Sequence, residues 1–75
     1  METLAKIAGQ EGREAYILAN NPEVIYLVRL QDVPAFQEQF DGYDVCVADS
    51  GMMAEEVRGG EIHFGGLYWQ VRNWR

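Results

Sequence analysis

The clearest pattern of apolar and polar positions along the chain lies at its C-terminal end. Two strand-like runs flank the Gly-Gly pair at residues 65–66, and such a pair tolerates the positive φ angles of a tight hairpin turn. A two-residue turn places Ile62 opposite Trp69 on a face that is apolar throughout, while the other face is mixed. Because register and burial pattern agree, we predict a β-hairpin over residues 61–73 with Ile62 and Trp69 buried.

At the other end of the chain, apolar residues recur near helical spacing from residue 2 to residue 19. Gly9 and Gly12 weaken this helix, because each glycine costs about 1 kcal/mol in a helix interior. One bent helix, or a frayed start followed by a helix, fits the pattern, and a strand over residues 15–19 is the alternative. The Asn-Asn-Pro sequence at residues 20–22 ends the segment, since proline disfavours a helical residue before it.

Two further segments have the composition of strands. Residues 24–30 are rich in β-branched and aromatic residues and apolar on both faces for most of their length, which is typical of a central strand covered on both sides. Residues 43–49 alternate, with Tyr43, Val45 and Val47 on one face. The intervening residues, about a dozen, are near the minimum length for a parallel crossover.

The segment between these strands predicts a two-turn helix. Pro34 suits the first helical position, and Gly42 suits a cap in left-handed conformation after the last turn. Phe36 and Phe40 lie four residues apart and therefore share one face. We expect this helix to dock on the sheet through its two phenylalanines.

Residues 52–58 predict another short helix, because Ser50 can cap its start and the glycines at 59–60 can end it. Met53 and Val57 would then face inward. The predicted element order is α-β-α-β-α-β-β, within one domain that takes in all 75 residues. The expected fold class is α+β, with a mixed sheet of three to four strands, the C-terminal hairpin, and two to three short helices packed on the sheet.

The negative charge of the chain is concentrated in its middle. The formal net charge is −6, and residues 31–61 carry eight acids against one base, Arg58. Such a field repels nucleic acid and membrane surfaces and attracts basic partners. Solvated surface is the plainer interpretation, because this net charge is ordinary for a small soluble domain. A docking face for a basic surface, including mimicry of the phosphate backbone, is the alternative.

Two sets of residues are candidates for binding a partner. The first consists of acids on predicted helices and loops that can share one sheet face: Asp32, Glu38, Asp41, Glu55 and Glu56. The second is the stripe formed by Tyr68, Arg72 and Trp74, since aromatic residues and arginine are enriched at protein interfaces. An ordinary sheet face covered by the N-terminal helix is the alternative for the stripe. We expect Trp74, next to the C-terminus, to be its least covered member.

Few residues suggest catalysis or metal binding. His63 is the single histidine, and no second His or Cys stands at metal-ligand spacing. His63 and Glu61 can form an acid–base pair, but we favour a half-solvated strand surface as their explanation. Cys46 is the single cysteine, and its neighbours Asp44 and Asp49 do not supply the electropositive setting of a reactive thiol, so we expect it to act as a small buried hydrophobe. We therefore expect no catalytic residue, no cofactor and no metal.

Size and segment lengths limit the remaining possibilities. A single cysteine allows no internal disulfide, the N-terminus lacks the basic region of a signal peptide, and the longest apolar run, residues 24–28, cannot span a bilayer. We expect a cytoplasmic protein. A chain this short buries only about 60% of its unfolded surface, so we expect a marginal core, a tendency to associate, and no deep pocket of the usual size.

These observations favour a small acidic protein–protein interaction module. By analogy alone, we favour an inhibitor or modulator of a nucleic-acid-binding machine, of the kind phages and mobile elements encode. A structural or assembly subunit, with acidity that merely solubilises it, is the alternative, and an enzyme using Glu61 and His63 is a distant one. We expect a protein partner and leave open whether it has a basic surface or is a second copy in a homodimer. Neither direct nucleic-acid binding nor membrane binding is expected.

Overall fold

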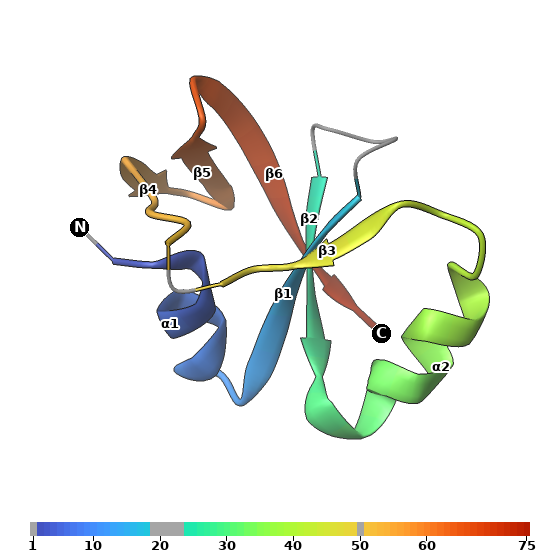
Figure 1. The fold of residues 1–75 in the computed structure, drawn as a ribbon. Coiled ribbons are helices and arrows are strands. Elements are labelled where there is room, and N and C mark those ends of the chain that lie inside the picture. Colours follow the sequence, from blue (N-terminus) through green and yellow to red (C-terminus); the bar gives the residue numbers. More distant parts are fainter. Residues whose placement is uncertain (1, 19–23, 50) are drawn as a thin grey trace.

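The computed structural model describes residues 2–18, 24–49 and 51–75 (Figure 1). Its centre is a six-stranded mixed sheet with the strand order β3-β1-β2-β6-β5-β4. The helices α1 and α2 lie on opposite sides of the central strands (Figure 1). The element bounds are α1 Leu4–Gly9, β1 Arg13–Leu18, β2 Val24–Arg29, α2 Val33–Gln39, β3 Val45–Val47, β4 Glu56–Arg58, β5 Glu61–Phe64 and β6 Leu67–Trp74, with a 3₁₀ turn at Leu30–Asp32.

The α+β class and the mixed sheet are as the sequence predicted, but the sheet has six strands instead of three to four. The parallel pair is β2 with β6, and the other pairs of neighbouring strands are antiparallel. Strands β2 and β3 run in the same direction, as a crossover requires, but β1 lies between them. In the part of the chain that the structure describes, no helix has the length and apolarity to cross a membrane.

The N-terminal segment is a short helix followed by a strand. Helix α1 begins after Thr3, whose Oγ1 accepts a hydrogen bond from the Lys6 N–H at 3.1 Å. The helix ends at Gly9, and Gly12 has a φ of 69°, which glycine adopts far more readily than other residues. The prediction of a helix to residue 19 is therefore wrong, and its strand alternative is correct for the described residues. The predicted stop at residues 20–22 lies outside them.

The helix predicted over residues 52–58 is also wrong. The segment is extended, its last three residues form β4, and Met53 and Val57 are exposed rather than inward-facing. Backbone hydrogen bonds to distant segments hold it in this shape: the N–H of Leu4 to Met52 (2.9 Å), of Ala54 to Glu2 (2.9 Å) and of Glu55 to His63 (2.7 Å). These long-range bonds outweigh a weak local helical preference. The predicted cap, Ser50, lies outside the described residues.

Two hydrophobic cores cover the two faces of the sheet. One packs α1 against β1, β2 and the hairpin and contains Ile25, Ile62 and Trp69. The other packs α2 against β1, β2 and β6 around Phe36. Strand β2 contributes to both cores, so the prediction of a central strand covered on both sides is confirmed.

The hairpin and the second helix also agree with their predictions. Strands β5 and β6 pair Ile62 with Trp69, and both side chains are buried. Helix α2 has proline in its first turn, and Gly42 follows it with a φ of 87°. Phe36 is fully buried and Phe40 is half-buried, both within the second core.

Candidate functional site

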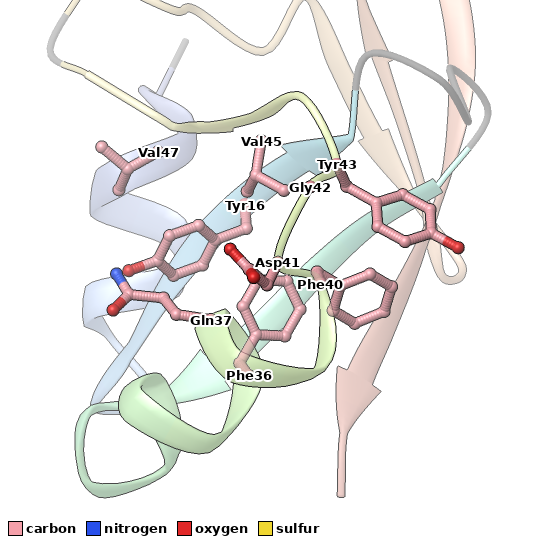
Figure 2. Close-up of a pocket in the computed structure, with 9 residues that line it drawn as sticks. All are labelled: Tyr16, Phe36, Gln37, Phe40, Asp41, Gly42, Tyr43, Val45 and Val47. Atoms are coloured by element: carbon pink, nitrogen blue, oxygen red, sulfur yellow. The ribbon is translucent and has the colours of Figure 1, made fainter.

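A cavity of about 340 Å³ lies between α2 and β3 (Figure 2). Ligand sites in proteins commonly range from about 300 to 1,000 Å³, so this open cavity is at the lower end of that range. Four of its lining side chains are aromatic, and the lining residues come from β1, α2, β3 and the loop between α2 and β3: Tyr16, Phe36, Gln37, Phe40, Asp41, Gly42, Tyr43, Val45 and Val47.

The aromatic side chains of this cavity form a connected group. Phe36 lies within α2 and Phe40 is the residue that caps its C-terminal end, and their ring centroids are 4.7 Å apart. Phe36 packs on Tyr16 from β1 at 4.9 Å, and Phe40 meets Tyr43 edge to face at 5.3 Å. The positive φ of Gly42 turns the chain after α2, so that Tyr43 returns toward Phe40. The cavity therefore has an apolar floor and an exposed aromatic rim.

The rim residues follow the alternation that the sequence predicted for this segment. Tyr43, Val45 and Val47 all line the cavity. Strand β3 is shorter than the predicted strand, since it begins at Val45 and ends at Val47. Cys46 is exposed, so its interpretation as a buried hydrophobe is wrong; it lies in a strand at the border of the sheet, where nothing described covers it.

Tyr16 is held in its neutral form at the inner wall of the cavity. Its hydroxyl donates a hydrogen bond to Glu14 Oε2 at 2.7 Å. Burial, together with the hydrogen bond and the charge of Glu14, raises the pKa of Tyr16 from 10.0 to about 12. The phenol is thus a fixed hydrogen-bond donor to Glu14 across the neutral pH range.

This pKa predicts a loss of stability in alkaline solution. Below about pH 10 Tyr16 is protonated in both the folded and the unfolded chain, so folding retains its full stability. Between about pH 10 and 12 the unfolded chain ionises first, and the free energy of unfolding falls by roughly 2 to 3 kcal/mol in total. Urea unfolding at about pH 9 and 11 should show a smaller loss for Tyr16→Phe than for wild type. Equal losses in both proteins would contradict this assignment, and Tyr43→Phe serves as the control at an exposed tyrosine.

The structure places the predicted acidic residues at separate parts of the sheet. Asp32 forms an ion pair with Arg29 (Nη2–Oδ2, 2.9 Å), Glu38 is exposed on α2, and Asp41 lines the cavity. Glu55 and Glu56 lie at β4, and β4 and β3 are at opposite ends of the strand order (Figure 1). Of the five acidic candidates, Asp41 is the one placed at the cavity.

The hairpin side of the sheet carries a separate cluster around His63. Its Nδ1 lies 3.2 Å from Glu55 Oε2, and its ring stacks on Tyr68 with centroids 4.5 Å apart. The Arg58 guanidinium lies over the Tyr68 ring at 5.0 Å from its centroid, and its Nε is 3.9 Å from Glu61. The structure therefore pairs His63 with Glu55 and not with Glu61, the acid considered from the sequence. The polar and charged side chains of this cluster therefore interact with one another at the protein surface.

Helix α2 covers one member of the predicted stripe, Trp74, and leaves Tyr68 and Arg72 exposed. Tyr68 and Arg72 are exposed, whereas Trp74 is only 6% exposed and meets Phe36 edge to face at 5.4 Å. The expectation that Trp74 is the least covered member is wrong, because α2 and not the N-terminal helix packs over this end of β6. Trp74 is a core residue.

No protein-family model matches the sequence, and no match was found among curated proteins or among solved structures. Within residues 2–18, 24–49 and 51–75, no group of three His, Cys, Asp or Glu side chains is placed to hold a metal ion. The cavity between α2 and β3 is the candidate site, on the strength of its size, its aromatic walls and its open rim.

Proposed function

We propose that this chain is a cytoplasmic interaction module that binds a basic segment of another protein at the cavity between α2 and β3. One observation carries the proposal: an aromatic-walled cavity lies in the most acidic part of the chain. Residues 30–49, which supply α2, its flanking loops and β3, contain five acids and no Lys, Arg or His. A partner that fits this site offers an apolar anchor next to positive charge.

The chemistry of the rim supports a protein partner over an anionic ligand. Asp41 lines the cavity and Asp44 follows Tyr43, so phosphate groups approaching the rim meet carboxylates. Aromatic side chains at a rim are typical anchors of protein interfaces, and Tyr43 is 54% exposed. An apolar or aromatic side chain enters the cavity, and basic side chains beside it meet the carboxylates.

The same charge pattern supports a narrower proposal about the biological role. Basic protein surfaces are the ones that hold the phosphates of nucleic acids. A module that covers such a surface competes with nucleic acid for it. We therefore propose that the partner is a nucleic-acid-binding protein that this chain inhibits or modulates, and duplex DNA should then displace the module from it.

The test compares two exposed tyrosines on different parts of the sheet. Tyr43 is at the cavity rim and is 54% exposed, whereas Tyr68 is on the hairpin and is 47% exposed. Proteins recovered from the native host on the immobilised wild-type chain should be lost on Tyr43→Ala and retained on Tyr68→Ala. If the proteins are lost on Tyr68→Ala and retained on Tyr43→Ala, the partner binds at the hairpin instead of the cavity. If they are retained on both variants, neither tyrosine lies at the binding surface.

A further inference from the structure

The outer strand at the cavity offers an unoccupied edge of the sheet. Strand β3 is at one end of the strand order and pairs with β1 on its inner side. The Ala48 N–H donates to the Ala15 C=O at 2.9 Å, which shows which backbone groups point toward β1. Because these directions alternate along a strand, the N–H and C=O groups of Val45 and Val47 point outward. Among the described residues, no strand lies on that outer side.

The opposite edge of the sheet differs in a way that matters for pairing. Strand β4 has Glu56 and Arg58 on either side of Val57, and charged residues in a short strand are a common protection against unwanted pairing. Strand β3 has the sequence Val-Cys-Val and no charge, and Val47 is 51% exposed. The edge beside the cavity therefore lacks the protection that the other edge has.

We propose that a segment of the partner adds to β3 as a seventh strand of the sheet, with one apolar side chain in the cavity and basic residues on either side. This inference rests on the proposed function and specifies how the partner binds. Strand addition to a sheet edge is a recurrent way of recognising an extended peptide: main-chain hydrogen bonds supply affinity and pockets for alternate side chains supply specificity.

The geometry of strand pairing directs the anchor into the cavity. Residues directly opposite one another in a pair of strands have their side chains on the same face of the sheet. Val45 and Val47 line the cavity, so a partner residue opposite either valine extends its side chain on the cavity side. In an antiparallel pair, the same partner residue also turns its N–H toward β3. The anchor residue and the hydrogen-bonding residue of the partner are thus the same.

The charges that flank β3 favour a basic partner over a second copy of this chain. Asp44 precedes β3, and Asp49 follows it by two residues. An antiparallel pair of two β3 strands would gather four carboxylates, Asp44 and Asp49 of each copy, at the ends of one short strand pair, and this concentration of like charge disfavours it. A segment with an apolar centre and basic ends places its positive charges beside these acids.

The experiment uses a labelled heptapeptide, Lys-Arg-Val-Phe-Val-Arg-Lys, and two N-methylated forms, with affinity measured by fluorescence anisotropy. Methylating the nitrogens of the phenylalanine and the arginine two residues after it blocks the hydrogen bonds to β3, so affinity should fall by about tenfold or more. Methylating both valine nitrogens, which point away from β3, should leave affinity within about threefold of the parent peptide.

A protein variant provides the reciprocal test. Val47→Pro removes an N–H that points outward and keeps the pairing with β1, whereas Val47→Ala keeps the N–H and shortens the side chain. Val47→Pro should bind the parent peptide at least about tenfold more weakly than Val47→Ala. Circular dichroism on both variants establishes that they fold.

The alternatives give different results in these experiments. Equal affinity for the two methylated peptides overturns strand addition and leaves binding at the cavity intact. Failure of the parent peptide to bind overturns the basic-segment proposal itself. A concentration-dependent mass in sedimentation equilibrium that the peptide does not change, but that Val47→Pro reduces to 8.6 kDa, would assign the β3 edge to a second copy and overturn the proposal. A mass of 8.6 kDa at micromolar concentration is the expected result.

Discussion

Phe36→Ala is expected to lower the free energy of unfolding by about 3–5 kcal/mol, the usual cost of removing a buried phenylalanine ring. Phe36 has no exposed surface and lies at the centre of the second core. Its ring centroid lies between 4.7 and 6.0 Å from those of four other aromatic residues: Tyr16, Tyr26, Phe40 and Trp74. At about 0.05–0.15 kcal/mol per residue, a chain of this length has roughly 4 to 11 kcal/mol of stability, so the variant loses much or all of it.

Phe40→Ala is the matched control for this variant, because it makes the same change at the C-terminal cap of the same helix. Phe40 is half-buried, so less apolar surface leaves the core and about 2 kcal/mol is expected. Urea unfolding followed by tryptophan fluorescence reports both, since Trp74 contacts Phe36. If Phe40→Ala costs as much as Phe36→Ala, the helix is not seated on the sheet through Phe36 as described.

The second large effect concerns binding. Asp41→Lys/Asp44→Lys reverses charge at the cavity rim, and the association rate of the basic heptapeptide should fall by about tenfold or more at low salt. The difference from wild type should shrink as salt rises, because the Debye length falls from about 10 Å at 0.1 M to about 3 Å at 1 M. Both residues are exposed, so the free energy of unfolding should change little. Stopped-flow fluorescence measures the rate.

The control for this variant is Glu55→Lys/Glu56→Lys at β4. Each double variant changes the formal net charge by the same amount, from −6 to −2, so the long-range attraction falls equally in both. Any further loss in the Asp41/Asp44 variant reports the position of the charges. If the Glu55/Glu56 variant associates as slowly as the other, net charge alone governs binding and the rim carboxylates have no special part.

The features that could be predicted from the sequence are those set by neighbouring residues. The hairpin follows from a Gly-Gly turn and strict alternation, and the register around Ile62 and Trp69 is as predicted. Helix α2 follows from Pro34 and Gly42 at its ends. Strand β2 follows from its composition, because an apolar run with β-branched residues on both faces requires cover on both sides.

The features that could not be predicted depend on distant partners. Residues 13–18 are compatible with helix or strand, and their pairing with both β2 and β3 decides for strand. Strand β4 exists because β5 offers it backbone partners, while the N-terminal segment bonds to the extended residues before it. Trp74 is buried because α2 crosses to that face, which no local pattern near the C-terminus indicates.

The cavity combines both kinds of feature. Its rim of Tyr43, Val45 and Val47 was recognisable as one face of a strand, and the two phenylalanines of α2 as one face of a helix. That these two faces meet around Tyr16 follows from the insertion of β1 between β2 and β3. A sequence signal existed for each wall, but none for their juxtaposition.

The unequal edges of the sheet also limit how copies of this chain can assemble. Fibres grow when each added molecule presents a fresh surface like the one that was just covered, as happens when strands stack without end. Here a strand joined at β3 leaves the short, charged β4 as the outer border on this chain's side. Strand addition at β3 therefore stops after one added strand, so this edge cannot build a fibre of repeated copies.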